Sequence, residues 1–490
     1  MDRSIPLRFS SPLSDLKERI MQKNLIVLEF NELSPELMDR FIAQGHLPNF
    51  EILKKESDVF ISDTIDHGSD EVEPWVQYCT SHTGVRAAVH QVMHLGSGNS
   101  YEGPRYWDVA SQAGRKVMIW SSMNAVVRDG FKGVLLPDPW AGDSIRPTPS
   151  NLESFYSFVS KNVQDHTKPG AAVTRFETLK FLWFIMTHGV SIGTFRGLAS
   201  QLMNEKKTGR FRWRRAFVLD RIIADIFCHF YSRFRPDLAT FFLNSTAFVQ
   251  HRFWRNMDPD AFQIKPTEVE QAELKNAVLE GYQNMDRILG KLRKVAEGAR
   301  FCLVTAHSQQ PHLKHESSGG KVTFRPKDFQ KWVVALKLPG VAKIEPVMTE
   351  QFRIFFHDQK SMEDSFRILS SIKVETEPAI SVRKEPNDAL FCGCSIHHSI
   401  DKDSKLNWID NGNPKEDSFY ALFYLIAALK SGRHHPDGIF WVSRDFNRGI
   451  VHEGRVPVGS VAATVLNLMD LPVPVDFQTP AVDIPTTGVV

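Results

Sequence analysis

The chain is poor in cysteine and has no long hydrophobic run. Its five cysteines are an odd number spread over 490 residues, and the first twenty residues are polar and mixed in charge. This pattern predicts neither disulfides nor a secretory signal, so we expect a reduced, cytoplasmic protein. The longest nearly apolar stretch, residues 181–195, is interrupted by His188, Gly189 and Gly193, whereas a spanning helix needs roughly 20 apolar residues. The sequence therefore predicts a protein that is soluble or at most peripheral to a membrane.

An excess of charge of either sign is also missing. Lys and Arg number 59 against 57 Asp and Glu, which gives a net charge of +2. Such a balance is not typical of proteins that wrap a polyanion, so no specific nucleic-acid partner is expected. Tyrosine is scarce at 8 residues while phenylalanine reaches 35. This difference predicts thick aromatic packing and leaves open an apolar groove or a membrane-facing patch.

What the chain does contain is an alternation of buried strands and amphipathic helices. At 490 residues it is too long for one small domain. Strands are predicted at 25–30, 116–121, 238–244, 301–306, 332–338, 352–356 and 438–443, and helices at 34–44, 106–114, 267–297 and 458–471. This alternation indicates an α/β fold with a central, mainly parallel sheet flanked by helices, decorated by a helical insertion and a smaller mixed insertion.

Changes in composition predict how the chain is divided. We expect an N-terminal arm (1–22), a core in three parts (23–150, 237–311 and 416–490), a helical basic insertion (151–236) and a mixed α+β insertion (312–415). Within the helical insertion, Arg and aromatic residues interleave at 210–216. We interpret this basic face as solvated, with two alternatives: a lid over an anionic substrate, or a patch through 181–216 that rests on acidic lipid or polymer.

Four blocks of sequence occur in the order, and at the strand ends, of one known fold. They read NLIVLEFNELSPELMDRFIAQGHLPNF (24–50), EPWVQYCTSHTGVRAAVHQV (73–92), TFFLNSTAFVQHRFW with the later LVTAHSQQP (240–311), and HHPDGIFWV with SVAATVLNLMDLPVPVD (434–476). Together they resemble the alkaline phosphatase superfamily, most of all its type I phosphodiesterase and nucleotide pyrophosphatase branch. The resemblance covers about half of the chain. It implies an alkaline-phosphatase-like fold and an enzyme that processes phosphoryl or sulfuryl esters.

The resemblance also implies a divalent-metal site made of carboxylates and imidazoles. His251, His307 and His434 stand where the family has imidazole ligands, but the family's acids fall on Asn31 and on two alanines. Two dications about 4 Å apart repel each other and need carboxylates to offset the repulsion. We therefore expect a reduced site with one zinc or manganese ion. Its predicted ligands are Asn31, Glu32, His251, His307 and His434.

The family's nucleophile has no direct counterpart, because its position falls on Pro74. The nearest candidates for a catalytic role are Thr80, Ser81 and Glu73, with His307 as metal ligand or as acid and base. Thr80 and Ser81 also fit a structural role as helix-start hydroxyls that bond backbone amides.

These residues predict a hydrolase or transferase of the phosphodiesterase or phosphatase kind, with an anionic small molecule or polymer as its substrate. An alternative is a catalytically inactive relative that binds a phosphorylated sugar, nucleotide or polymer as a partner or scaffold, since the missing residues are those that the reaction needs. A third hypothesis is chemistry without a metal, with Glu29, Glu32 or Glu73 as general base.

Overall fold

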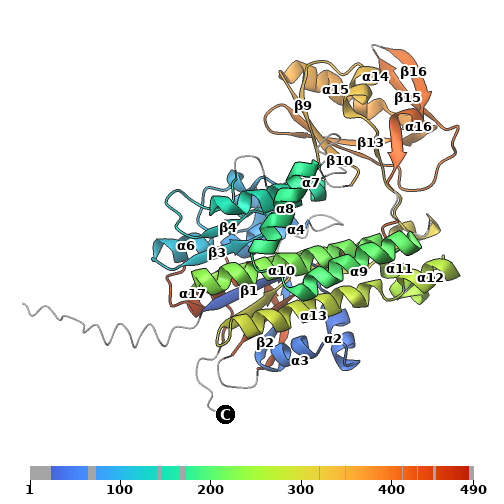
Figure 1. Ribbon diagram of the computed structural model, residues 1–490. Coiled ribbons are helices and arrows are strands. Elements are labelled where there is room, and N and C mark those ends of the chain that lie inside the picture. Colours follow the sequence, from blue (N-terminus) through green and yellow to red (C-terminus); the bar gives the residue numbers. More distant parts are fainter. Residues whose placement is uncertain are drawn as a thin grey trace, which may run out of the picture.

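Two bodies of different size make up the chain (Figure 1). The computed structural model describes residues 24–64, 73–141, 145–164, 173–318, 320–347, 349–410, 412–426, 429–444 and 449–484. The predicted N-terminal arm, residues 1–22, lies outside the described residues. The larger body surrounds a central sheet, and the smaller body lies beside it at the upper right of the view.

The larger body is built on an eight-stranded sheet with the order β20-β2-β19-β6-β1-β5-β3-β4. Its strands are β1 (Leu25–Phe30), β2 (Ser57–Asp63), β3 (Val117–Trp120), β4 (Val134–Leu136), β5 (Leu238–Leu243), β6 (Arg300–Val304), β19 (Asp437–Ser443) and β20 (Val451–Pro457). Neighbouring strands run parallel, except that β19 is antiparallel to both β2 and β6. The predicted α/β class with a mainly parallel sheet is therefore confirmed.

The side chains of β1 are all buried and alternate between the two faces of the sheet. Ile26, Leu28 and Phe30 belong to one hydrophobic cluster, and Leu25 and Val27 belong to another. Since both faces are apolar, helices must cover both. The first cluster includes residues of α2 (Pro35–Ala43), α3 (Pro48–Lys55), α7 (Glu153–Gln164), α8 (Arg175–Thr187), α10 (Arg215–Phe234), α11 (Ser245–Met257) and α13 (Ala277–Val295). The second includes α6 (Tyr106–Gln112) and α17 (Ser460–Leu468).

The predicted helical insertion forms part of the layer that covers the sheet. The ring of Phe227 in α10 lies 5.8 Å from the ring of Trp120 in β3 and 4.6 Å from that of Phe241 in β5, measured between centroids. The insertion also contains α9 (Ile192–Thr208), which together with α8 lies toward the viewer in Figure 1. The remaining helices of the larger body are α4 (Pro74–Thr83), α5 (Ala87–His90) and α12 (Glu268–Leu274).

The smaller body has a hydrophobic cluster of its own, made of residues between 322 and 429. Its elements are β8 (Phe324–Pro326), α14 (Phe329–Leu336), β9 (Val341–Pro346), β10 (Gln351–Phe356), α15 (Gln359–Ser371), β11 (Lys373–Val374), β12 (Glu377–Pro378), β13 (Ile380–Glu385), β14 (Ala389–Cys394), β15 (Lys405–Asp410), β16 (Asn413–Ser418), α16 (Phe419–Leu422) and β17 (Phe423–Leu425). The predicted boundary at 415 lies inside β16, and β17 still pairs with β8. The chain enters and leaves the smaller body at adjacent positions, because Lys321 and Lys430 exchange two backbone hydrogen bonds of 2.9 and 3.0 Å.

Two predicted elements differ from the structure. The sequence pattern predicts a strand at 332–338, but most of these residues belong to α14. The Asp328 carboxylate caps this helix by accepting hydrogen bonds from two backbone amides, and Trp332 and Leu336 are buried one turn apart. A good N-cap and a helical burial period outweigh the β preference of Val333 and Val334. The helix predicted at 267–297 is divided into α12 and α13, and only α13 has buried residues.

No helix within the described ranges is long and apolar enough to cross a membrane. The cytoplasmic location remains a prediction.

Candidate metal centre

Three neighbouring strands end at one edge of the sheet. β1 is flanked by β5 and β6 in parallel register, so the carboxyl ends of the three strands lie together, where α/β proteins usually bind ligands. Asn31 follows β1, Asn244 follows β5, and His307 follows β6. The Asn31 side-chain nitrogen donates a hydrogen bond of 2.7 Å to the Asn244 side-chain oxygen. Asn244 is exposed, so this edge opens to solvent.

Glu32 lies in the turn after β1 and has a left-handed backbone, with φ 60°. A non-glycine residue in this region is strained and needs support from its surroundings. Gln250 of α11 provides support, because its side-chain amide donates a 2.7 Å hydrogen bond to the Glu32 carbonyl oxygen. The Glu32 carboxylate is itself oriented by two donors, Asn31 to Oε1 at 3.0 Å and Gln309 to Oε2. Glu32 is 2% exposed, so its carboxylate is held inside the protein.

A short antiparallel ladder brings His434 to the same edge. β7 (Ser308–Pro311) pairs with β18 (Gly432–His435), and this places His434 opposite Gln309. A Cβ on Gly432 would lie 2.5 Å from the Gln250 carbonyl oxygen and 2.5 Å from Gln309 Oε1. Glycine is therefore required for β18 to approach α11 this closely.

Three ligand atoms converge at this point: Glu32 Oε2, His251 Nε2 and His434 Nε2. The separations are 3.1 Å between Glu32 and His251, 3.6 Å between Glu32 and His434, and 3.2 Å between His251 and His434. In the plane of these three atoms, the point equidistant from them lies roughly 1.9 Å from each. A point slightly out of this plane lies at the zinc–nitrogen and zinc–oxygen bond lengths of about 2.0–2.2 Å. The spacing is thus that of three corners of a tetrahedron around one ion. Among the described residues, this is the only group of three or more His, Cys, Asp or Glu side chains whose ligand atoms lie within 4.8 Å of one another.

The tautomer of His251 suits metal binding. Its Nδ1 lies 3.0 Å from the Gly432 carbonyl oxygen, which can only accept, so Nδ1 carries the proton. In the neutral ring, Nε2 then presents a lone pair toward Glu32 and His434. A ligand histidine normally donates its other ring N–H to a carbonyl or carboxylate in this way.

The charges around the site also suit a cation. Burial raises the pKa of Glu32, but at acidic pH the positive charge of the protonated imidazoles of His434, His251 and His307 outweighs this effect and holds the pKa well below its usual value. Burial lowers the pKa of His434 well below its ordinary value, and it lowers the pKa of His307 to about 4, although the Glu32 charge acts against both shifts. An ionised carboxylate beside these neutral imidazoles is the protonation state that metal ligation requires. A buried carboxylate is costly without a positive partner, so the residues present fit a divalent ion.

His307 lies beside this group and lacks hydrogen bonds of its own. Its Nε2 is 3.8 Å from Glu32 Oε1, and neither ring nitrogen has a hydrogen-bond partner among the described residues, although the side chain is fully buried. Buried imidazoles are almost always paired, so an unpaired one indicates a bound water, ion or ligand. His307 is therefore placed to act as a fourth ligand or as an acid or base next to the ion.

Asn31, the remaining predicted ligand, reaches the site differently. Its side-chain nitrogen faces Glu32 and Asn244, so in this arrangement the residue orients the carboxylate. Its side-chain oxygen is buried without a hydrogen-bond partner among the described residues.

Thr80 and Ser81, the predicted nucleophiles, bond within their own helix. The Val92 amide donates to His90 Nδ1 at 3.0 Å, so His90 Nε2 carries the proton and donates to Thr80 Oγ at 3.1 Å. Thr80 in turn donates to the Val76 carbonyl at 3.3 Å, and Ser81 donates to the Tyr78 carbonyl at 2.8 Å. His90 therefore cannot act as a base toward Thr80, and neither hydroxyl has support here as a nucleophile.

Two acidic candidates do not belong to the group of three ligand residues. Glu73 is the N-cap residue of α4, before Pro74, and its side chain makes no capping hydrogen bond. Glu29 faces the opposite side of the sheet from Ile26 and Leu28, and its Oε1 lies 2.7 Å from His82 Nε2, with both side chains 1% exposed. A metal-free general base at either glutamate remains a prediction.

Sequence reasoning missed three residues of the site. Gln250 and Gln309 hold the Glu32 backbone and carboxylate, and their neighbours in sequence, His251 and Ser308, were the only hint. Tyr78 is also buried, and burial with the nearby charges of Glu29 and Glu32 raises its pKa well above the usual value. Its hydroxyl therefore stays protonated and remains a potential donor.

The fold and the donor set together define an α/β protein with a candidate mononuclear metal centre. No protein-family model and no curated protein matches the chain. Solved structures do match. Phosphonoacetate hydrolase from Sinorhizobium meliloti 1021, in complex with phosphonoacetate, is 12% identical with a TM-score of 0.41, and the match covers 92% of this chain and 95% of that one.

Two further matches are mammalian proteins. Murine ectonucleotide pyrophosphatase/phosphodiesterase 5, an inactive form in complex with AMP, is 11% identical with a TM-score of 0.40. The human protein is 8% identical with a TM-score of 0.42, and each match covers 92% of this chain and 96% of the other. Their names are those of the branch that the sequence motifs resemble. Likeness at this level assigns no activity, and the function proposed below rests on the geometry of the site.

Proposed function

We propose that the chain is a phosphoester- or sulfoester-processing hydrolase or transferase with a reduced metal site. One divalent ion, zinc or manganese, would be held by Glu32, His251 and His434. The observation that carries the proposal is the triangle of their ligand atoms, with sides of 3.1, 3.2 and 3.6 Å. When bound, the ion would polarise a phosphoryl or sulfuryl oxygen and offset charge that develops on it.

The chain's own residues have separate tasks in this proposal. Asn31 and Gln309 orient the carboxylate of Glu32, and the Gly432 carbonyl fixes the His251 ring. His307 is neutral at physiological pH, since its pKa is lowered to about 4, and can accept a proton from an attacking hydroxyl or water. Because Thr80 and Ser81 are bonded to their own helix, the attacking group is water or a hydroxyl of a second substrate.

The second candidate is a non-catalytic relative that binds a phosphorylated sugar, nucleotide or polymer. One specific observation favours it: the hydroxyls nearest the family's nucleophile position are buried and already bonded to backbone. The same edge of the sheet would then serve only to hold an anion.

Metal analysis followed by activity assays separates the two. We expect about one zinc or manganese ion per chain in purified protein and turnover of bis-para-nitrophenyl phosphate or para-nitrophenyl sulfate. His251→Ala and His434→Ala should each remove the metal and the activity while the protein melts normally. His398→Ala, at an exposed histidine paired with Glu377, is the matched control and should change neither.

Full metal content and activity in both variants would overturn the ligand assignment. A bound metal without turnover of either ester, combined with tight binding of a phosphorylated sugar, would favour the second candidate.

A further inference from the structure

Helix α8 is hydrophobic on both sides, although only one side is covered. Its inward side chains are Phe181, Phe184 and Ile185, which belong to the core. Its outward side chains include Phe176 (64% exposed), Leu179 (64%), Trp183 (70%) and Met186 (67%). These four recur at intervals of three and four residues, so they form one stripe along the helix. A helix that is apolar all round is normally covered on both sides.

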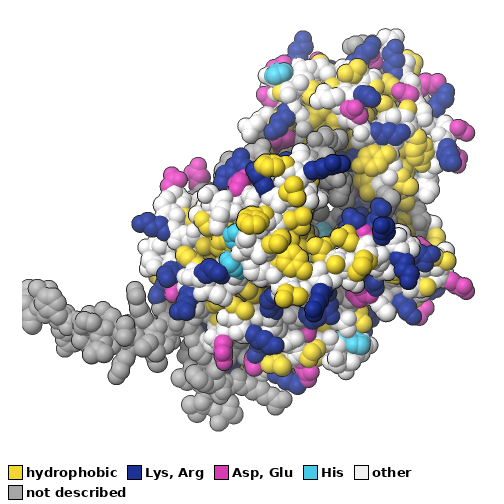
Figure 2. Space-filling model, in the orientation of Figure 1, with side chains coloured by type: hydrophobic (Ala, Val, Ile, Leu, Met, Phe, Trp, Pro, Cys, Tyr) yellow, Lys and Arg dark blue, Asp and Glu magenta, His cyan; other side chains and the backbone are white. Residues whose placement is uncertain are grey.

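Helix α9 extends this surface. Ile192 is 71% exposed, Leu202 48% and Met203 65%. Figure 2 shows hydrophobic side chains gathered over α8 and α9 on the side that faces the viewer. We refer to the exposed apolar residues of these two helices as the α8–α9 face: Phe176, Leu179, Trp183, Met186, Ile192, Leu202 and Met203. Contiguous apolar patches of this kind mark interaction sites.

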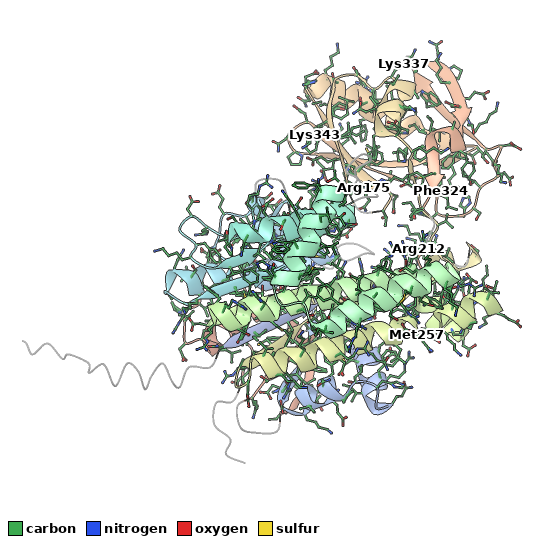
Figure 3. All side chains as sticks on the ribbon, in the orientation of Figure 1. Arg175, Arg212, Met257, Phe324, Lys337 and Lys343 are labelled. Atoms are coloured by element: carbon green, nitrogen blue, oxygen red, sulfur yellow. The ribbon has the colours of Figure 1, made fainter. Side chains whose placement is uncertain are left out.

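The charges around the α8–α9 face are mainly positive. Residues 173–216 contain nine Lys or Arg and only two acidic residues, Glu177 and Glu205. Both acids are paired inside the chain, Glu177 with Lys161 and Glu205 with Arg215. Two more of the nine basic residues are also in ion pairs, Arg210 with Glu273 and Arg214 with Glu280, so the segment keeps an excess of positive charge. Basic residues stand at both ends of the face, with Arg175 at the start of α8 and Arg212 beyond the end of α9 (Figure 3).

We infer that the α8–α9 face docks on the surface of a lipid bilayer that carries anionic headgroups. Apolar and Trp side chains that protrude beside Lys and Arg are the combination that binds the boundary between headgroups and acyl chains. A second copy of this chain is a poor partner, because a two-fold interface would place two basic faces against each other. The helices would lie in the plane of the membrane surface, since no described helix is long and apolar enough to span it.

Vesicle flotation tests the inference. The full chain should float with vesicles of phosphatidylcholine mixed with phosphatidylserine, and not with phosphatidylcholine alone, and added salt should weaken the binding. Trp183→Ser with Met186→Ser should lower the partition coefficient by about tenfold or more, since it removes two exposed apolar side chains. The matched control is Val334→Ser with Val451→Ser, at positions 73% and 70% exposed elsewhere on the surface, and it should bind as the unaltered chain does.

Two double charge-reversal variants test the electrostatic contribution to membrane binding, and they remain informative if the apolar variant fails to fold. Lys206→Glu with Lys207→Glu should weaken binding to the anionic vesicles by about tenfold or more. Lys373→Glu with Lys402→Glu, at exposed positions of the smaller body, makes the same change of net charge and should have little effect.

Three results would overturn the inference. They are absence of binding to both kinds of vesicle, equal binding to both, and binding that neither variant pair weakens. Self-association that requires Trp183 and occurs without vesicle binding would assign the face to a second copy of the chain. All of these readouts are independent of the metal centre.

Discussion

At the scale of single residues, the site depends on how a buried carboxylate is oriented and neutralised. Glu32 accepts hydrogen bonds from Asn31 and Gln309 and faces three imidazoles, two of which are neutral at physiological pH. A cation at the common point of the ligand atoms would satisfy the charge. The amide of Asn31 stabilises the Glu32 carboxylate by donating a hydrogen bond to it, whereas a second acid at this position would repel it.

This difference predicts the behaviour of Asn31→Asp. The variant replaces a donor by a second buried carboxylate, so without metal it should be less stable, by about 3 kcal/mol. Zinc should offset the repulsion, and the rise in melting temperature on adding zinc should be larger than for the unaltered chain. Thermal melts with zinc and with a chelator measure both effects. Asn162→Asp, at an exposed site on α7, is the control. Equal responses to zinc in Asn31→Asp and the unaltered chain would count against a metal at this position.

The sequence could indicate the histidines of this site but not the residues that orient them. His251 and His307 each follow a predicted buried strand, so parallel topology brings them to one sheet edge. His434 precedes a strand and reaches the same edge because β19 runs antiparallel to β6, which the sequence pattern did not indicate. Gln309 reaches Glu32 only because β7 pairs with β18, whose residues are far away in the sequence. Such a pairing between short polar strands has no local signal.

At the scale of elements, the approach of β18 to α11 sets the position of His434. Gly432→Ala would insert a methyl group 2.5 Å from the Gln250 carbonyl oxygen, and the backbone there cannot yield without moving β18. We expect metal affinity to fall by about tenfold or more, the range seen when supporting residues of metal ligands are changed. Competition with a chelating dye measures the affinity.

The control is Gly193→Ala, where the new Cβ would have only Ser191 Oγ nearby, at 3.9 Å. Unchanged affinity in Gly432→Ala would show that β18 does not position the ligand.

The packing of α10 against α11 and α13 predicts a pH dependence of stability. Asp220 accepts hydrogen bonds from Ser245 and, at 3.3 Å, from Asn284, and burial raises its pKa to about 7. In the unfolded chain the group titrates near pH 4, so the folded state binds the proton more tightly. The stability contributed by the protonated form is complete below about pH 4 and is lost as the pH rises to about 7.

Asp220→Asn should remove this dependence. At pH 8 the variant should be more stable than the unaltered chain, by on the order of 4 kcal/mol at most, and at pH 4 the difference should vanish. Melting temperatures across this range measure it, with Asp260→Asn, whose side chain is 98% exposed, as the control. A constant difference at all pH values would contradict the assignment.

Sequence patterns predict some of the elements of the sheet well. β1, β5, β6 and β19 are short, apolar and bounded by polar turns, so they were predicted almost to the residue. The strand predicted at 332–338 is wrong because the cap formed by Asp328 outweighs side-chain preference. The composition of α10 shows its basic residues but does not reveal that one face of the helix packs on Trp120 and Phe241.

At the scale of the whole molecule, the smaller body has its own core and its ends are adjacent. A fragment from residue 320 to residue 431 should therefore fold alone, since its hydrophobic cluster is complete and Lys321 pairs with Lys430. A cooperative thermal transition by circular dichroism and dispersed amide resonances would be the evidence. The control is the same fragment with Trp332→Ala, which removes a fully buried ring and should lose about 3–5 kcal/mol. A fragment that stays unfolded would show that the larger body is needed to hold it together.

The adjacency of Lys321 and Lys430 also affects how the larger body assembles. β6 and β19 are neighbours in the sheet, yet the smaller body separates them along the chain. If this body forms first, its ends are already joined, and the roughly one hundred residues between them act as a short connection. Folding of the smaller body then closes the long loop between β6 and β19, so the entropy cost of this closure arises before β19 inserts between β2 and β6.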